Sequence, residues 1–436
     1  MSTCPDFTAA TSRAVVDLDA IAHNAHVLSA VAGVPWMAVV KADAYGHGLM
    51  PVALTCLRAG ATWLGVAQLG EALELRRMLD AAGLARPAEG PDGVPQPEAP
   101  RLMSWLAPVV DPQDAGEPGS PLRAALDADL DLSASTVEQL WALRAACRAH
   151  LEAGGAPGRV HLKVDTGMSR SGAVAQDQPA LAEAAREAQD EGVLDVVGLW
   201  SHLSRADEPG CGSTEDHLAR FLDAERVVLE AGLAPRVRHL AATGGLLWHP
   251  DTRLDLVRVG IGLYGLSPNP QVATGQALDL RPAMRLEAPL AQVKRIPAGQ
   301  AVSYGGTWSA PTDRWVGLVP LGYGDGLPRA ASGTGPVAVA GLRTTIVGRV
   351  CMDQVVVDLG PAVEVAGPRA GAPIPPPARA GDLAVLWGDP GADPTVPGVD
   401  DWARACGTIN YEIVTRLGPR VPRCATGRFR ETVTQE

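Results

Sequence analysis

Only three of the 37 lysine and arginine residues in this chain are lysine, namely Lys41, Lys163 and Lys294. Arginine stays protonated in proteins, whereas lysine can lose its proton and act as a nucleophile, a base or an imine-forming amine. Lys41 directly follows the apolar run 36–40, which is typical of a β-strand. Amine chemistry at Lys41 is therefore the first hypothesis, with an ordinary lysine at a strand end as an equally good interpretation of this residue alone.

The segment that carries Lys41 belongs to a pattern of short β-type runs alternating with longer helical runs between residues 14 and 260. The expected strands are residues 36–40, 63–66, 102–106, a weak one at 126–132, 160–164, 194–199, 237–240 and 254–257. Repeated β–α units form parallel sheets, and eight of them in about 250 residues are typical of a closed barrel. The fold expected for residues 12–278 is thus an α/β barrel of the (β/α)8, TIM-like type.

The chain changes in character beyond about residue 280. The expected strands there are residues 290–296, 315–320, 337–339, 344–350, 355–359 and 383–387. These runs are short, rich in Val, Ile and Thr, and separated by Gly and Pro turns, which predicts a mostly β C-terminal domain over residues 279–436. Two Pro- and Gly-rich stretches, 85–100 and 361–381, are expected to be mobile surface loops without regular structure.

Composition excludes several classes of partner and location. A net charge of −12 argues against nucleic acid or an anionic membrane as the main partner. The chain has no run of about 18 apolar residues, and its first residues lack the basic and apolar segments of a secretion signal. Seven cysteines without a Cys-x-x-Cys pair fit free thiols in a reducing compartment. We therefore expect a cytoplasmic protein that binds a small molecule, and no metal site.

The chemistry expected of the barrel depends on its carboxyl-terminal mouth, because functional groups in such barrels come from the strand ends. Lys41 is expected there, and the loops after strands seven and eight usually build a phosphate site. These loops are the glycine-containing segments 239–245 and 258–265, in which Thr243 adds a hydroxyl donor. A reactive amine opposite two anion-binding loops suits a phosphorylated aldehyde, pyridoxal 5'-phosphate (PLP), bound to Lys41 as a Schiff base.

With these residues in view, the chain resembles the alanine racemase family, the fold-type III PLP enzymes, over nearly its whole length. The matching stretches are residues 38–48, 161–170, 200–203, 256–265, 302–307, 322–326, 348–354 and 408–416. Eight ordered motifs across two expected domains make a chance similarity negligible. The resemblance implies an N-terminal barrel, a C-terminal β domain, and a head-to-tail homodimer with both active sites at the interface.

The resemblance also implies two catalytic bases, one for each face of the planar intermediate. Lys41 is the base for D-alanine, and Tyr304, supplied by the partner subunit, is the base for L-alanine. A phenol with a pKa of about 10 is a poor base near neutral pH, so Tyr304 needs neighbouring donors, for which His202 and Arg170 are the candidates. A turn tyrosine before two glycines is the alternative interpretation of Tyr304.

Binding roles follow from the same resemblance. Arg258 is expected to face the PLP pyridine nitrogen and to donate a hydrogen bond without protonating the ring. Arg170 and the backbone N–H of Met352 are expected to hold the substrate carboxylate. The phosphate is expected to contact Tyr45, Thr243, Gly260, Ile261 and Tyr411, while His202 packs against the ring and Tyr323, Arg349 and Asp353 line the entrance. A salt bridge at the barrel rim is the alternative for Arg258.

Lys163 resembles a lysine that captures CO₂ as a carbamate and thereby orients Arg170, which requires a neutral amine. A structural ion pair with an acidic neighbour explains this lysine nearly as well. Two positions depart from the family pattern. The loop after strand seven often contains Asn-Ser and here contains Ala242 and Thr243, and Ser169 replaces a common glycine beside Arg170.

The function expected from all of this is PLP-dependent interconversion of L-alanine and D-alanine, which supplies D-alanine for peptidoglycan. A racemase that prefers serine, or one of broad specificity, uses the same catalytic set and is the runner-up. A fold-type III decarboxylase is disfavoured because it needs an acidic residue in place of Arg258. From another class, a non-catalytic PLP carrier has a similar barrel but lacks the second domain.

Overall fold

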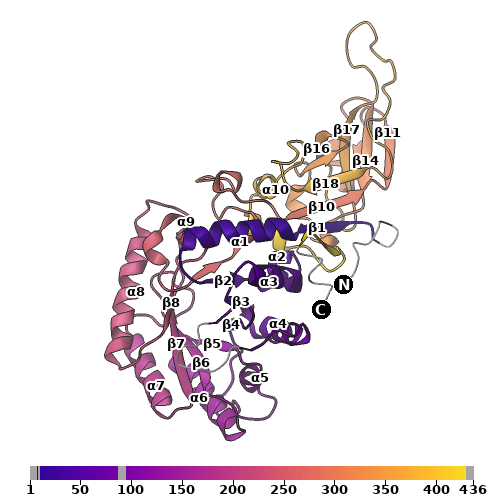
Figure 1. Cartoon of the computed structure of the whole chain (residues 1–436). Coiled ribbons are helices and arrows are strands. Elements are labelled where there is room, and N and C mark those ends of the chain that lie inside the picture. The colour runs from indigo at the N-terminus through magenta and orange to yellow at the C-terminus, as the bar shows by residue number, and fades with distance from the viewer. Residues whose placement is uncertain (1–6, 8–9, 87–94, 429–436) are drawn as a thin grey trace.

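The computed structural model describes residue 7, residues 10–86 and residues 95–428 of the 436-residue chain. Figure 1 shows two parts, a ring of strands surrounded by helices and a β-rich part that extends away from the top of that ring. The α/β barrel followed by a mostly β domain, expected from the sequence, is therefore confirmed. None of the helices in the described ranges is long and apolar enough to cross a membrane.

The barrel contains eight strands in the order β8-β7-β6-β5-β4-β3-β2-β9, and every hydrogen-bonded pair among them is parallel. The strands are β2 (Trp36–Val39), β3 (Trp63–Gln68), β4 (Arg101–Leu106), β5 (Asp131–Ala134), β6 (Gly158–Lys163), β7 (Leu194–Trp200), β8 (Val237–His239) and β9 (Val257–Val259). At the remaining seam a single parallel bridge joins Ala242 to Arg258. The ring is thus nearly closed, with Arg258 at the join.

The helices around the ring bury one face each against the strands (Figure 1). They are α1 (Leu18–Ala32), α3 (Leu49–Arg58), α4 (Leu69–Ala81), α5 (Pro121–Asp127), α6 (Val137–Glu152), α7 (Gln178–Asp190) and α8 (Ser213–Glu230), with the short α2 (Lys41–Gly46) and α9 (Thr243–Trp248) at the mouth. The first helix shows how sequence sets the bounds. Asp17 caps its start by accepting hydrogen bonds from the N–H groups of Asp19 and Ala20, and Gly33 ends it with φ +64°.

The expected fourth strand is displaced. Of the predicted range 126–132, the first residues belong to α5, and the strand β5 begins only at Asp131. This strand carries Asp131 and Ser133, which are buried polar residues, so it lacks the apolar pattern that identifies the other strands. The weak strand predicted at 126–132 therefore shares only residues 131 and 132 with β5.

The β domain is built on a nine-stranded sheet in the order β11-β14-β17-β16-β15-β18-β10-β1-β19. Its strands are β1 (Arg13–Asp17), β10 (Met284–Pro289), β11 (Gln292–Ile296), β14 (Arg314–Val319), β15 (Pro336–Val339), β16 (Leu342–Val347), β17 (Val355–Pro361), β18 (Leu383–Trp387) and β19 (Arg423–Thr426). The two remaining strands, β12 (Ala301–Val302) and β13 (Trp308–Ser309), pair with each other, and the helices are α10 (Val399–Cys406) and α11 (Asn410–Thr415). All neighbours are antiparallel except β1 and β19.

One strand of this sheet comes from the segment expected to form the barrel. β1 pairs with β10 and β19, so residues 13–17 belong to the large sheet although they precede the barrel in sequence. The proposed boundary at residues 278/279 lies between the last barrel strand, β9, and β10. The chain thus passes from β1 of the large sheet through the barrel and returns to the same sheet at β10.

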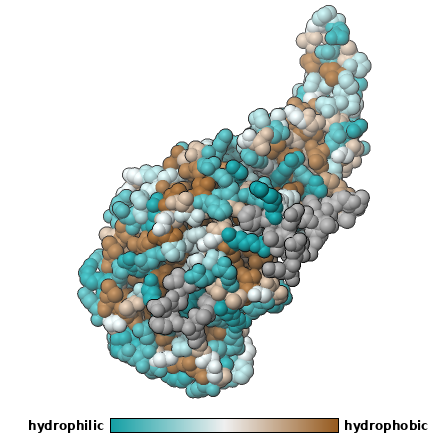
Figure 2. Space-filling model, viewed as in Figure 1, coloured by the Kyte–Doolittle hydropathy of each residue, from teal (hydrophilic) through white to brown (hydrophobic). Residues whose placement is uncertain are grey.

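The Pro-rich insertion 361–381 follows β17 and projects from the far end of the β domain (Figure 1). The outgoing and returning segments of this loop pair with each other. The N–H of Glu364 donates to the carbonyl of Ala372 at 2.9 Å, and Val363 forms an antiparallel bridge with Pro373. Figure 2 shows hydrophilic and hydrophobic residues mixed along it. This loop is more regular than expected. Of the other insertion, 85–100, residues 87–94 lie outside the described residues.

Candidate active site

A cavity of about 520 Å³ opens at the carboxyl ends of the barrel strands, and we call it the barrel cavity. The residues that line it are Val39, Lys41, Tyr45, Ala67, Trp105, Leu106, Lys163, Arg170, Ser171, Trp200, His202, Ala242, Thr243, Gly244, Arg258, Gly260, Ile261 and Tyr411. Ten of these residues carry site roles in the sequence analysis, so the fold brings together side chains that are up to 370 positions apart. The tryptophans Trp105 and Trp200 had no predicted role.

Lys41 enters the cavity through an unusual backbone turn. The four residues after it, Ala42 to Tyr45, all have left-handed φ values of +53° to +54°, although none is glycine. This conformation costs roughly 1–2 kcal/mol per residue and therefore needs support. The Glu71 carboxylate accepts a hydrogen bond from the N–H of Ala42 at 2.6 Å, and the Asp43 carboxylate accepts one from the N–H of Leu49 at 2.8 Å. The turn aims both Lys41 and Tyr45 into the cavity.

The surroundings of Lys41 favour its neutral form. Burial lowers the pKa of its amine, and the positive charges of Arg170 and Arg258 lower it further, against an opposing effect of Glu71. Its Nζ lies 5.9 Å from the ring centroids of both Tyr45 and Trp105. A larger fraction of the amine is therefore available as a nucleophile or base near neutral pH than for a solvated lysine.

Arg258 is fixed by backbone acceptors. Its guanidinium donates to the carbonyl oxygens of His239 and Ser201, each at 2.8 Å, and of Leu240 at 3.0 Å. It also lies 3.2 Å from Nδ1 of His202. Burial lowers the pKa of Arg258 to about 9, so the group stays charged at neutral pH. No carboxylate in the described part of the chain pairs with it, which removes the rim salt bridge as an explanation.

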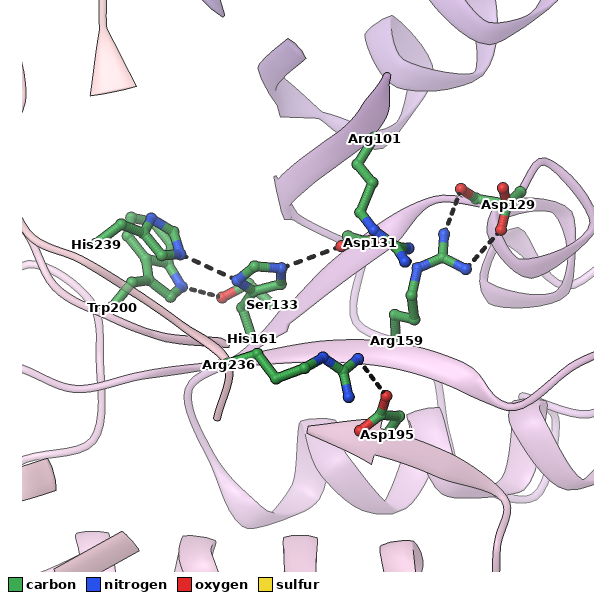
Figure 3. A network of polar contacts seen from close by, with 10 residues as sticks. All are labelled: Arg101, Asp129, Asp131, Ser133, Arg159, His161, Asp195, Trp200, Arg236 and His239. Carbon is green, nitrogen blue, oxygen red and sulfur yellow. Dashed lines mark hydrogen bonds and ion pairs between the residues drawn. The ribbon is translucent and has the colours of Figure 1, made fainter. Parts of the chain in front are cut away.

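A buried chain of hydrogen bonds continues from Arg258 into the barrel, and Figure 3 shows its inner part. The Arg258 Nη1 lies 3.1 Å from His239 Nδ1, His239 Nε2 lies 3.0 Å from His161 Nδ1, and His161 Nε2 lies 3.2 Å from the Asp131 carboxylate. Because a carboxylate only accepts and a guanidinium only donates, each imidazole donates toward Asp131. Arg159 holds Asp131 from the other side at 2.5 Å and helps to lower the pKa of that carboxyl.

The sequence analysis missed this row of hydrogen bonds, because its members are single polar residues on different strands. Asp131, His161 and His239 are each fully buried, and Trp200 stacks on His239 with ring centroids 5.5 Å apart. Burial and the charge of Arg258 lower the pKa of His239, so its ring is neutral and can accept from the arginine. Both the three carbonyl acceptors and the hydrogen bonds that lead through His239 to Asp131 therefore fix the position of Arg258.

Lys163 ends strand β6 and points at the same cavity. Its Nζ lies 4.2 Å from the ring centroid of Trp200, and burial together with Arg258 and Arg170 lowers its pKa to about 8. Within the described ranges no carboxylate lies within salt-bridge distance of it. The nearby Asp165 carboxylate instead accepts hydrogen bonds from the backbone N–H groups of Gly167 and Ser169. The alternative of a structural ion pair therefore has no support in the geometry.

The opposite end of the cavity is rich in neutral donors. The Thr243 hydroxyl accepts from the N–H of Gly260 at 3.1 Å and keeps its own hydrogen for a ligand. Thr243 also begins α9, whose first N–H groups have no side-chain cap. Burial raises the pKa of Tyr45 and Tyr411, so both phenols stay protonated. A side chain at Gly260 would come within 2.7 Å of the Tyr45 hydroxyl, so glycine leaves the cradle open.

These groups fit PLP, because neutral donors at one end suit a phosphate and a desolvated amine suits its aldehyde. A charged guanidinium between them suits a ring nitrogen that accepts a hydrogen bond. The replacement at Ala242 removes a side-chain amide but leaves the hydroxyl of Thr243 in place. The residues present therefore fit the cofactor that the sequence analysis expected.

Five further residues with expected roles lie on the β domain, and we call them the β-domain cluster. They are Tyr304, Tyr323, Arg349, Met352 and Asp353. The first is 72% exposed and Met352 is 53% exposed. A side chain at Gly305 would lie 3.1 Å from the guanidinium of Arg349, and the N–H of Tyr323 donates to the carbonyl of Cys351 at 3.0 Å. Asp353 pairs with Arg420 at 2.8 Å. None of the five is among the described residues that line the cavity of their own chain.

Comparisons with known proteins match two family models to two parts of the chain. The family model described as alanine racemase, N-terminal domain, matches residues 16–268, and that of the alanine racemase C-terminal domain matches residues 283–425. A protein named alanine racemase from Beutenbergia cavernae is 50% identical over 417 residues, which cover 95% of this chain and 98% of that protein. Another of the same name from Salinispora arenicola is 45% identical, covering 94% and 97%.

Solved structures give the same result. The crystal structure of alanine racemase from D-cycloserine producing Streptomyces lavendulae aligns with a TM-score of 0.83 at 43% identity, covering 97% of this chain and 98% of that chain. The structure of alanine racemase from Streptomyces coelicolor A3(2) gives a TM-score of 0.82 at 44% identity, covering 96% and 98%. With both domain models matched and relatives of this identity spanning nearly the whole sequence, the chain belongs to the alanine racemase family.

Proposed function

We propose that this protein interconverts L-alanine and D-alanine with PLP as cofactor, and that each active site uses one barrel cavity and the β-domain cluster of a second subunit. The observation that carries the proposal is the barrel cavity itself. In it a lysine with a lowered pKa shares one space with a charged arginine and a set of phosphate-binding donors. Relatives that share this fold at 43–50% identity carry the name alanine racemase.

The cofactor is held by side chains from both ends of the cavity. Lys41 would bind its aldehyde, Arg258 would face its pyridine nitrogen, and His202 would pack against its ring. Its phosphate would contact Tyr45, Thr243, Tyr411 and the backbone N–H groups of Gly260 and Ile261. When bound, PLP supplies the electron sink that acidifies the Cα–H of an attached amino acid.

Proton transfer at Cα is divided between two residues. Lys41 exchanges the proton of D-alanine on one face, because its lowered pKa leaves a neutral amine able to accept it. Tyr304 of the partner subunit exchanges the proton of L-alanine on the other face. The cation Arg170 and the neighbouring His202 are the groups able to stabilise a phenolate there.

The substrate carboxylate is held by Arg170 and by the backbone N–H of the partner subunit's Met352. Lys163 supports Arg170 as a carbamate, for which a neutral amine is needed. A pKa of about 8 supplies a fraction of neutral amine near physiological pH. The residues of the β-domain cluster that remain, Tyr323, Arg349 and Asp353, line the entrance.

Arg258 restricts the reaction to racemisation. A guanidinium donates a hydrogen bond to a ring nitrogen without transferring a proton, so the ring withdraws fewer electrons than a protonated one. An aminotransferase or a decarboxylase needs the stronger electron withdrawal that a carboxylate partner provides. The carbonyl acceptors and neutral His239 around Arg258 leave no such carboxylate beside it in the described residues.

We also infer a head-to-tail homodimer, since residues with complementary roles lie on two different domains of one chain. A place in the cytoplasm, and a role in supplying D-alanine for peptidoglycan, follow as proposals from the family and from the amino-acid product. The runner-up activities are racemisation of serine or of a broader set of amino acids, because the same bases serve all of them.

The first test is chiral analysis of the purified protein incubated with PLP and L-alanine, beside an equal incubation with L-serine. We expect D-alanine to form well ahead of D-serine. Faster formation of D-serine moves the assignment to a serine racemase. Bound PLP without any D-amino acid supports a non-catalytic carrier.

The second test addresses the shared site. The variants Lys41→Ala and Tyr304→Phe are each expected to be inactive, but a mixed dimer contains one site in which both residues are native. Random exchange of equal amounts of the two variants therefore restores about one quarter of the native sites. Activity that stays at the level of the separate variants after verified subunit exchange means that both bases come from one chain.

A further inference from the structure

A buried histidine outside the barrel cavity connects two loops that line it. His217 lies on α8, is only 3% exposed, and uses both ring nitrogens. Its Nδ1 lies 2.7 Å from the Thr166 hydroxyl, and its Nε2 lies 2.9 Å from the Ser204 hydroxyl. Neither these three residues nor Ser201 line the cavity, so they can affect chemistry only through their neighbours.

The direction of every hydrogen bond in this group follows from one carbonyl. The Ser201 hydroxyl donates to the carbonyl of Val164 at 2.7 Å, so its oxygen accepts from the Thr166 hydroxyl at 2.9 Å. Thr166 has then used its only hydrogen and must accept from Nδ1–H of His217. In the neutral ring Nε2 is an acceptor, and Ser204 donates to it. Burial and the charge of Arg220 lower the pKa of His217, which keeps the ring neutral.

The group joins the elements that carry the substrate-binding side chains. Thr166 lies between Lys163 and Arg170, in the loop after β6. Ser201 and Ser204 flank His202, and the carbonyl of Ser201 accepts from Arg258 at 2.8 Å. The loop is tied to α8 a second time, because Arg220 donates to the carbonyl of Thr166 at 3.1 Å.

We propose that His217 is a positioning residue for Arg170, holding the loop after β6 at the depth at which that arginine meets a substrate carboxylate. The inference rests on the proposed function, because it takes the carboxylate as the group that Arg170 binds. It requires a side chain that donates at one end and accepts at the other with the spacing of an imidazole. A glutamine amide meets that requirement, whereas leucine fills similar space without either group.

The test compares His217→Leu with His217→Gln. We expect His217→Leu to raise the KM for L-alanine about tenfold, with kcat changed less than about threefold, because ground-state carboxylate binding is what weakens. The dissociation constant of propionate, a carboxylate without an amine, rises by the same factor. His217→Gln restores both values to within about threefold of the native protein, and the PLP content per chain is unchanged in both variants.

Thr166→Val removes the same hydrogen bond from the other end with little change in volume, and it keeps the test decisive if His217→Leu does not fold. We expect at least the same rise in KM, because Thr166→Val also removes the hydrogen bond to Ser201, and the double variant should bind no more weakly than Thr166→Val, since His217 acts through Thr166. His150→Leu is the matched control, because His150 bonds to Asp127 on the outside of the barrel at 2.9 Å. It leaves KM unchanged.

A lowered melting temperature with native values of KM and propionate affinity in His217→Leu and Thr166→Val overturns the proposal and leaves His217 a structural role. Failure of the proposed function is separate, because it is read from the native protein, which then forms no D-alanine at all. In that case propionate binding by the native protein and its variants still tests the position of Arg170.

Discussion

The barrel cavity is lined by ten residues with expected roles and the β-domain cluster contains five, and the two regions hold these residues in different ways. In the cavity, Arg258 is buried and bonded to three carbonyls, and Lys41 and Lys163 have lowered pKa values. In the cluster, Tyr304 is 72% exposed and Met352 is 53% exposed. One region is organised within a single chain, and the other gains a buried environment only when something covers it.

The difference indicates how the proposed active site divides its work. Electrostatic tuning requires exclusion of water, so it resides in the barrel, where burial is the largest single cause of the lowered pKa values of Lys41, Lys163 and Arg258. A base that enters from the second subunit needs a defined position, which a short turn on an antiparallel sheet can give, and it meets the donors that stabilise its phenolate in the barrel cavity. The proposed catalytic pair should therefore respond differently to mutation, with cofactor chemistry sensitive to the barrel and stereochemistry sensitive to the cluster.

The largest effect is expected for Lys41→Ala, which removes the amine on which cofactor attachment and one proton transfer both depend. Racemisation should fall roughly 10⁴-fold or more. Borohydride reduction followed by peptide mass analysis should find no covalent lysine–PLP link. Lys294→Ala is the matched control, since Lys294 is an exposed lysine on β11 of the β domain. A reducible link at another lysine in Lys41→Ala contradicts the assignment.

Tyr304→Phe removes the base of the β-domain cluster and keeps its ring. Racemisation should fall about 10²- to 10⁴-fold, while PLP stays bound because the barrel is untouched. In D₂O the two enantiomers should then differ in how fast their Cα proton exchanges for deuterium. Lys41 should still exchange the Cα proton of D-alanine, and exchange into L-alanine should be lost, as measured by NMR of the recovered amino acid.

Two outcomes count against that division of work. Exchange into L-alanine at the native rate means that Tyr304 is not its base. Loss of PLP from Tyr304→Phe means that the cluster supports the cofactor, and that the two regions are less independent than their burial indicates.

Lys163→Met tests the electrostatics of the barrel cavity with a side chain of similar length. The Lys163 amine loses its proton near pH 8 in the folded chain but near 10.4 in the unfolded chain. The folded chain therefore binds fewer protons between these values, and its stability rises with pH there. The melting temperature of the native protein minus that of Lys163→Met should therefore increase as the pH rises from 8 to about 10.4.

The carbamate proposal makes the same variant informative about function. Lys163→Met should raise the KM for alanine about tenfold, because Arg170 loses its anionic neighbour. Carbamate formation needs the neutral amine, so in the native protein incubated with ¹³C-bicarbonate the NMR signal of the carbamate carbon should fall as the pH drops below 8. An identical ¹³C spectrum for Lys163→Met shows that the lysine is not carbamylated.

The same contrast explains how far the sequence alone could go. Six of the eight barrel strands were predicted to within two residues of their observed bounds, because buried parallel strands read as apolar runs. The predicted range 254–257 shares only Val257 with β9. The polar strand β5 was misplaced, and β1 was assigned to the wrong part, since its partner β10 lies some 270 residues away. Pairings over such distances leave no local pattern.

The buried polar groups were missed for a related reason. Asp131, His161 and His239 are inconspicuous singly, and each becomes interpretable only when the barrel sets it beside the next. The left-handed turn after Lys41 also has no signal, because Ala42 and Ala44 occupy positions where glycine is the usual choice. The residues of the exposed cluster, in contrast, were assigned through short motifs that resemble those of the family, and their roles stay predictions.

Two strained serines give the smallest expected effect and compare the regions directly. Ser169, beside Arg170, has φ +55°, and its hydroxyl has no hydrogen bond in the described ranges, so Ser169→Gly should raise the free energy of unfolding by about 0.5–1 kcal/mol. Ser303, beside Tyr304, has φ +63°, but its hydroxyl donates to the carbonyl of Arg349 at 2.7 Å. Ser303→Gly should leave the free energy of unfolding unchanged, because the lost hydrogen bond offsets the relieved strain. Equal gains in denaturant unfolding would mean that this hydroxyl does not hold the turn of Tyr304.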